Sequence, residues 1–108
     1  SLLGEHDFTS FAKKRTQVYT HLCTIDTCSW KRLADGWEFT IQGNRFLRGM
    51  VRALVGTMVK VGRGKITPKE FNHIKTAMNN EMADFSAPAH GLFLEQVLFS
   101  ESTSRFLL

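Results

Sequence analysis

The sequence predicts one α+β domain in which helices cover an antiparallel sheet, in the order helix, strand, strand, helix, helix, strand. Three observations support this fold class. The length of 108 residues suits a single domain. Apolar residues alternate with polar ones at Trp37, Phe39 and Ile41, as in a strand with one buried face. Between residues 46 and 62, apolar residues recur at helical spacing instead.

The first helix is expected at residues 7–14, DFTSFAKK. Asp7 suits the N-cap, and Phe8 and Phe11 would share the buried face. A basic triplet closes the segment, where cations favour the helix dipole, and it suits a solvated turn or a contact with an RNA backbone. The triplet consists of Lys13, Lys14 and Arg15.

A β-hairpin is expected next, from residues 17–33 through a turn at 34–36 into the alternating run. Both cysteines, Cys23 and Cys28, lie in its first strand. An odd separation of five places their thiols on opposite faces, which disfavours a disulfide or a shared metal unless a bulge intervenes. We interpret them as small hydrophobic residues in a reducing cytoplasm.

The C-terminal half is predicted to contain the helix at 46–62, a second helix and a strand. Thr67 and Glu70 predict a capping box for the second helix, which should end near residues 79–80. Residues 92–99 are apolar on both faces, which is typical of a strand inside a sheet.

Several classes of protein are disfavoured by composition and spacing. No apolar run approaches the roughly 20 residues of a membrane span, and the N-terminus has neither an initiator Met nor the layout of a secretory signal. We therefore expect a domain excised from a longer cytoplasmic protein, without a membrane partner. The histidines lack the spacing of zinc ligands, so no metal site is predicted. Neither a catalytic triad order nor a P-loop occurs, so the chain alone is a poor candidate for a complete enzyme.

The positive charge of the chain is local. The formal net charge is +4, and no acidic residue occurs between Glu38 and Glu70. Seven bases lie in that interval, and the remaining seven are outnumbered by ten acids. A basic stretch of this kind is expected of a protein that binds a phosphate-rich partner. The seven bases are Arg45, Arg48, Arg52, Lys60, Arg63, Lys65 and Lys69.

The predicted helix at 46–62 has two different faces. One is an apolar stripe that should pack on the sheet, made of Leu47, Met50, Val51, Leu54, Val55, Met58 and Val59. Helical rotation brings a second group to the opposite face: Arg45, Arg48, Arg52, Gly56 and Arg63. Because a helical glycine costs about 1 kcal/mol relative to alanine, Gly49 and Gly56 suggest close approach of another backbone or a ligand. A solvated basic face is the alternative.

Three blocks of the sequence resemble the C-terminal half of the tRNA pseudouridine synthase A family. They are GEHDFTSF at 4–11, NRFLRGMVRALVGTMVKVGRG at 44–64 and APAHGLFLEQVLF at 87–99. The resemblance covers nearly the whole chain. Its middle block is the most specific, because FLRGMVR is followed by LVG and then by VGRG.

The resemblance implies the C-terminal half-domain of the pseudouridine synthase fold. Such enzymes isomerise uridine to pseudouridine in the anticodon stem-loop of tRNA, without cofactor or metal, as homodimers with a basic cleft. The resemblance also implies an N-terminal domain whose sheet joins this one, with the active site between the two. The family's catalytic aspartate lies in an RTD-type motif of that domain, which does not occur in this sequence. The fragment is therefore expected to be inactive alone, with tRNA and the N-terminal domain as partners.

The resemblance assigns roles to individual residues. Arg52 would pair with the catalytic aspartate, and a guanidinium suits this role because it keeps a carboxylate ionised and oriented. Leu92, directly after Gly91, would line the uracil pocket, with Phe46 and Met50 beside it. Core packing is the alternative for these apolar residues.

Further residues are assigned a motif position or an RNA contact. His6 and Asp7 match the family's HDF element, although helix capping also accounts for Asp7. The residues expected to contact RNA are Arg45, Arg48, Lys60, Arg63, Lys65, Lys13, Lys14 and Arg15.

Two other functions stay open at this point. A free-standing RNA-binding module would use the stretch from Arg45 to Lys69, and it would bind with steep salt dependence and without another domain. A dimerisation domain would instead turn the glycine-bearing face toward a protein partner. In that case Arg52→Ala would change the oligomeric state.

Overall fold

The computed structural model describes five stretches of the chain: residues 2–13, 20–34, 36–87, 91–98 and 101–107, with the backbone alone for 92–98 and 101–102. Their elements are β1 (Gly4–Asp7), the 3-10 helix η1 (Thr9–Phe11), β2 (Leu22–Leu33), β3 (Gly36–Gly43), α1 (Met50–Gly62), α2 (Pro68–Thr76), the 3-10 helix η2 (Asn80–Met82), β4 (Leu92–Leu98) and β5 (Glu101–Leu107). The α+β class is confirmed. The predicted order of elements is not, because strand β1 and a short 3-10 turn stand where the first helix was expected, and a further strand, β5, follows β4.

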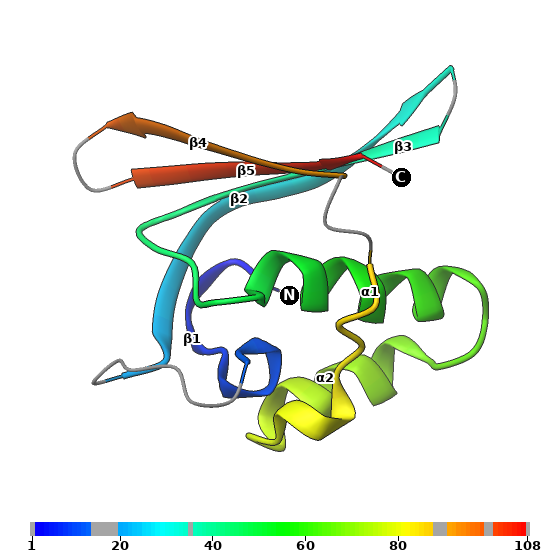
Figure 1. Cartoon of the computed structure of the whole chain (residues 1–108). Coiled ribbons are helices and arrows are strands. Elements are labelled where there is room, and N and C mark those ends of the chain that lie inside the picture. The colour runs from blue at the N-terminus through cyan, green and yellow to red at the C-terminus, as the bar shows by residue number, and fades with distance from the viewer. Residues whose placement is uncertain (1, 14–19, 35, 88–90, 99–100, 108) are drawn as a thin grey trace.

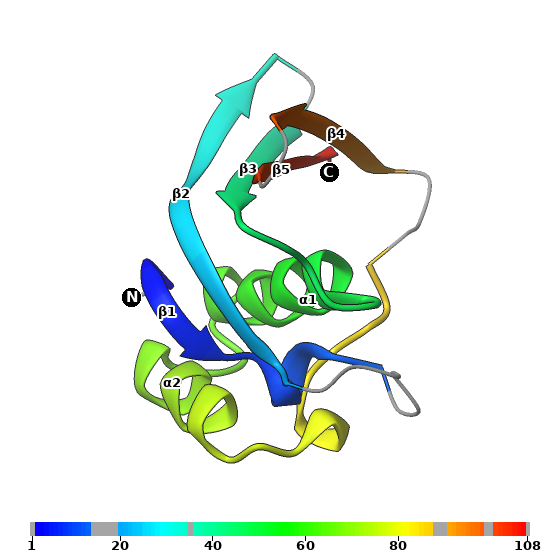
Figure 2. The ribbon, with the colours of Figure 1, turned by 90° about the vertical axis from the view of Figure 1, so that its left-hand side faces the viewer.

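One antiparallel sheet has the strand order β1-β2-β3-β5-β4. Figure 1 shows α1 and α2 on one side of it, and Figure 2 shows β2 curving along α1 toward β1. The predicted hairpin is confirmed as β2 and β3, paired from Leu33 and Gly36 onward. Phe39 and Ile41 of its alternating run are buried, whereas Trp37 near the turn is 45% exposed.

The predicted N-terminal helix at 7–14 is wrong. Residues Gly4–Asp7 form β1, which pairs with β2, and only a short 3-10 turn follows. Phe8 and Phe11 are both buried, as the pattern requires, but two apolar residues three apart suit a single turn as well as a helix. Phe8, not Asp7, is the N-cap residue of this turn. Asp7 precedes it, and its Oδ1 accepts hydrogen bonds from the backbone N–H (2.9 Å) and the hydroxyl of Thr9.

The helix predicted at 46–62 begins four residues later, at Met50. Gly49 precedes it in a left-handed conformation with φ of 73°, which interrupts a helical path and favours glycine. A Cβ at Gly49 would also lie 2.8 Å from Cγ of Lys13. The apolar stripe is confirmed: Met50 and Leu54 are buried completely, and Met58 packs partly buried against the core.

The start of α2 is confirmed in detail. Thr67 Oγ1 accepts a hydrogen bond from Glu70 N–H, and Glu70 Oε1 accepts one from Thr67 N–H, each at 3.0 Å. These two bonds satisfy backbone donors that have no partner inside the helix. The helix ends at Thr76, before the expected residues 79–80, and Met78 follows with a positive φ of 55°.

The two cysteines do not lie on opposite faces. The register of β2 against β3 shifts between Ile25 and Thr27, and this irregularity inserts an extra residue into β2. Cys23 is therefore buried in the core, and Cys28 is partly buried against the same core. Both thiols are free, and burial raises the pKa of each. Both therefore pack as small hydrophobic residues, as interpreted, although Cys23 is buried completely.

The last two strands form a second hairpin. The strand predicted at 92–99 is observed as β4, whereas β5 was not predicted. The sequence of β5, ESTSRFL, has small polar residues where an interior strand usually has apolar ones. It nevertheless pairs with β3 on one side and β4 on the other, and Ser104 and Phe106 are buried.

Candidate functional site

The position of Arg52 is set by contacts with a distant part of the chain. Arg52 lies in the first turn of α1 and is half-buried. Its Nε donates a hydrogen bond to the carbonyl oxygen of Ala87 (2.7 Å), and its Nη2 donates a longer one to the carbonyl of Phe85 (3.4 Å). The guanidinium therefore lies against residues 84–87, which we call the 84–87 segment. In Figure 1 this segment is part of the yellow to orange trace that passes α1 on its way from α2 to β4.

The same face of α1 holds the 84–87 segment at its other end. A Cβ at Gly56 would lie 2.3 Å from the carbonyl oxygen of Asp84, so only glycine fits the observed path. Thr57 Oγ1 accepts a hydrogen bond from Asp84 N–H (3.0 Å), and Lys60 Nζ lies 3.6 Å from Asp84 Oδ2. The expected close approach at Gly56 is thus confirmed, and the approaching group is the chain's own backbone.

The carboxylate of Asp84 is stabilised in its ionised form. Ser86 donates to it, with its backbone N–H 2.8 Å from Asp84 Oδ1. Hydrogen bonds from Ser86, and less strongly the charge of Lys60, lower the pKa of Asp84. Asp84 therefore stays charged at neutral pH and can compensate the charge of Lys60.

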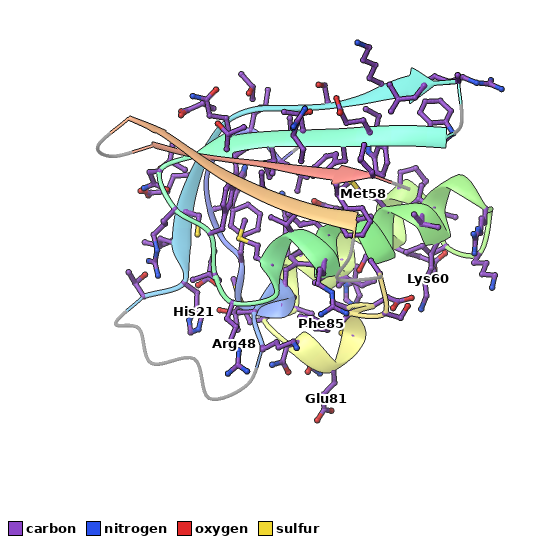
Figure 3. All side chains as sticks on the ribbon, turned by 45° about the horizontal axis from the view of Figure 1, so that its top comes forward. His21, Arg48, Met58, Lys60, Glu81 and Phe85 are labelled. Atoms are coloured by element: carbon purple, nitrogen blue, oxygen red, sulfur yellow. The ribbon has the colours of Figure 1, made fainter. Side chains whose placement is uncertain are left out.

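The predicted single arginine face does not form, because Arg45 and Arg48 precede the helix. Arg45 donates through Nη1 to the carbonyls of Thr20 (3.0 Å) and Leu22 (3.3 Å), so it holds the chain beside β2. Arg48 is exposed near the start of α1, with Lys13 beside it. Figure 3 shows Arg48, Phe85 and Lys60 spread along α1.

The basic side chains form two clusters at opposite ends of α1. The N-terminal cluster, Lys13 and Arg48, lines a shallow hollow of about 360 Å³ together with Asn80, Glu81 and Phe85. The C-terminal cluster contains Lys60, Arg63 and Lys65, which line a hollow of about 190 Å³. Lys14 and Arg15 lie outside the described residues.

The residues assigned to a uracil pocket are placed in two regions. Met50 is fully buried in the core, and Phe46 is partly buried against it, which favours core packing for Met50. Gly91 is buried, and a Cβ there would lie 2.5 Å from the carbonyl oxygen of Leu107. The backbone of Leu92 begins β4, while its side chain lies outside the described part of the structure.

The HDF element lies in β1 and has local contacts. His6 Nε2 is 2.7 Å from the carbonyl oxygen of Leu3, and Asp7 Oδ1 accepts a hydrogen bond from Thr9 N–H. Within the described part of the chain, neither residue forms a hydrogen bond with Arg52. Their motif role therefore stays a prediction.

A larger apolar groove lies away from Arg52 and the 84–87 segment. It measures about 960 Å³ and is formed by the β2–β3 hairpin, the end of α1 and the start of α2. Trp30, Trp37, Met58 and Phe71 contribute apolar surface, and among the described residues that line it Arg63 alone is a predicted site residue. Nothing in the described structure indicates what covers this groove.

In the part of the chain that the structure describes, no helix has the length and apolarity needed to cross a bilayer. Among the same residues, no three His, Cys, Asp or Glu side chains come together in a way that could hold a metal ion.

Comparisons with known proteins agree with the resemblance seen in the sequence. The profile of the tRNA pseudouridine synthase family matches residues 1–100. The tRNA pseudouridine synthase A of Bacillus pumilus is 44% identical over 98 residues, which are 91% of this chain and 40% of the relative. That of Parabacteroides distasonis is 46% identical over 95 residues (88% and 38%), and that of Bacteroides fragilis is 46% identical over 102 residues (94% and 40%). The chain thus spans about 40% of the length of these curated relatives, and it belongs to the tRNA pseudouridine synthase family.

Proposed function

We propose that this chain is the C-terminal domain of a tRNA pseudouridine synthase that isomerises uridine to pseudouridine in the anticodon stem-loop of tRNA. In this proposal the domain completes the active-site cleft and binds tRNA, and it is inactive without an N-terminal domain that supplies the catalytic aspartate. The full-length enzyme would be a cytoplasmic homodimer. Family membership supports the isomerase chemistry, and the fixed orientation of Arg52 is the observation that carries the role of this domain.

In the proposed enzyme, Arg52 orients the catalytic aspartate and keeps it ionised. A guanidinium has five N–H donors, and the carbonyls of Ala87 and Phe85 accept two of them. Neutral carbonyls fix the direction of the side chain but leave its charge intact. A carboxylate from the N-terminal domain could then form a bidentate, charge-assisted pair with the remaining donors. Such a pair lowers the pKa of the carboxylate.

The two basic clusters are proposed to bind tRNA phosphates on either side of this arginine. Both lie along α1, and Arg48, Arg63 and Lys65 are exposed. Phosphate contacts orient an RNA without reading its sequence. This arrangement supports binding of a folded RNA across the helix.

The test compares wild-type full-length protein with its Arg52→Ala and Arg52→Lys variants. Pseudouridine formed in undermodified tRNA and tRNA affinity are measured in parallel. Arg52→Ala is expected to lower kcat by about 100-fold or more while affinity changes little, because a charge that acts on the reacting groups is lost. Thermal unfolding followed by circular dichroism checks that the loss of the contacts between Arg52 and the 84–87 segment has not destabilised the whole protein.

Arg63→Ala is the matched control, since it removes an exposed arginine from the other end of α1. It should weaken tRNA binding and preserve kcat. Unchanged turnover in Arg52→Ala would return Arg52 to a structural role and remove the main support for the proposal. Pseudouridine formation by the 108-residue chain alone would contradict its inactivity, and tRNA binding by that chain as tight as by the full-length protein would favour a free-standing binding module.

A further inference from the structure

The 84–87 segment is held by one continuous face of α1. Arg52 contacts its C-terminal end, whereas Gly56, Thr57 and Lys60 contact Asp84 at its start. Arg52, Gly56 and Lys60 follow one another at four-residue spacing, so they share a face over two turns. Thr57 lies about 100° further round the helix from Gly56, on the buried side. The 84–87 segment is therefore packed against α1 from Asp84 to Ala87.

The close packing of the 84–87 segment on α1 depends on the absence of a side chain at Gly56. The carbonyl oxygen of Asp84 occupies the space that a Cβ would take, at 2.3 Å, and the Asp84 carbonyl carbon lies at 3.2 Å from the same point. Any other residue at position 56 would push the segment away from α1. Gly56 thus sets how closely the 84–87 segment approaches the helix.

The hydroxyl of Thr57 fixes the position of the 84–87 segment through hydrogen bonds. Its Oγ1 donates to the carbonyl of Ala53 (2.7 Å) and accepts from Asp84 N–H (3.0 Å). The side chain is 1% exposed, so water does not substitute for either bond. A buried hydroxyl with both bonds satisfied is costly to disturb and has one preferred geometry.

We propose that Gly56 and Thr57 are positioning residues that act on catalysis through Arg52. They place Asp84, the segment continues to Phe85 and Ala87, and the carbonyls of those two residues orient the guanidinium. This inference rests on the proposed function, because it needs Arg52 to act on the reaction. A misplacement of about 1 Å at a reacting group can lower a rate by about 100-fold. The chain of contacts is short enough to transmit such a shift.

The experiment uses the full-length protein with Thr57→Val and Thr57→Ser. Valine keeps the shape but lacks the hydroxyl, and serine restores it. Thr57→Val is expected to lower kcat about 10-fold with KM and tRNA affinity unchanged, and Thr57→Ser should stay within about 3-fold of wild type. Thr76→Val is the matched control, because its hydroxyl donates to the carbonyl of His73 on exposed α2, away from the segment.

Two further measurements separate a positioning role from simple stability. In an Arg52→Lys background, Thr57→Val should lower kcat by less than about 2-fold, because residues that act through one another are not additive. Hydrogen exchange in the full-length protein should become faster at residues 84–87 in Thr57→Val alone. This exchange does not depend on activity.

The outcomes distinguish this inference from the proposed function. An equal kcat loss in the Arg52→Lys background, or no rescue by serine, would refute action through Arg52. Unchanged hydrogen exchange at residues 84–87 would refute the claim that Thr57 holds this segment against α1. Wild-type protein that forms no pseudouridine would overturn the proposed function and the positioning role together, while the exchange data would still show whether Thr57 holds the segment.

Discussion

Gly56→Ala is the smallest change that should disturb the packing of the 84–87 segment on α1. The added Cβ would lie 2.3 Å from Asp84 O, whereas ordinary contacts begin at 3.4 Å. The obstructing atom is backbone, so a side-chain rotation cannot relieve the clash. The carbonyl must therefore move by about 1 Å, and the hydrogen bond from Asp84 N–H to Thr57 Oγ1 is lost or stretched beyond 3.0 Å.

The expected change in stability follows from three opposing contributions. Alanine in a helix interior is about 1 kcal/mol more favourable than glycine. Overpacking costs about 1–3 kcal/mol, and a buried donor left without its acceptor costs about 1–3 kcal/mol. The net loss for Gly56→Ala is therefore about 1–5 kcal/mol. For a domain of this size each kcal/mol lowers Tm by about 4–8 °C.

Urea unfolding of the chain, followed by far-ultraviolet circular dichroism, measures this loss from the midpoint and slope of the transition. Gly62→Ala is the matched control, because it lies at the end of the same helix and a Cβ there meets nothing within 4 Å. It should be neutral or stabilising by up to about 1 kcal/mol. If Gly56→Ala proves as stable as wild type, the segment is loosely held and the reasoning fails.

Two further predictions concern charge. Arg48→Gln in the full-length protein should weaken tRNA binding and reduce the slope of log affinity against log salt by about 0.7–0.9 for one lost phosphate contact. Lys69→Gln on α2, outside both basic clusters, is the control, and equal slopes for Arg48→Gln and wild type would exclude that contact. Because Ser86 lowers the folded-state pKa of Asp84, Asp84 contributes stability that is present above its unfolded pKa and is lost as pH falls through the folded value. Asp84→Asn should thus lose stability at pH 7 and much less at pH 3 in urea titrations, and an equal loss at both would refute this account.

Much of the fold could be predicted because local patterns were strong. The capping box at Thr67 and Glu70 and the alternation through Phe39 and Ile41 depend on neighbouring residues alone. The two strands that were not predicted, β1 and β5, depend on contacts between distant residues. β1 exists because Gly4–Asp7 pair with β2, and the polar β5 is held between two other strands. Single-sequence patterns contain no information on such pairing.

The site was predicted less completely for a related reason. Helical periodicity correctly separated the apolar face of α1 from its other face, but it extended the helix through Gly49 and so aligned Arg45 and Arg48 with Arg52. The positive φ at Gly49 ends that alignment. Periodicity also cannot show what covers a face. The closeness implied by Gly56 was correct, yet its partner lies 28 residues later, at Asp84.

Two cations on this face of α1 are held in chemically different ways. Lys60 lies 3.6 Å from the Asp84 carboxylate, whose low pKa keeps it charged, so the charge of Lys60 is compensated locally. Among the residues that the structure describes, Arg52 instead donates only to neutral carbonyls, which orient a guanidinium without compensating it. An oriented and uncompensated charge is useful for stabilising an anion, because no reorganisation is needed when that anion arrives. The 84–87 segment therefore contacts both cations, with Lys60 paired to its first residue and Arg52 oriented at its end, where the proposed function requires a positive charge.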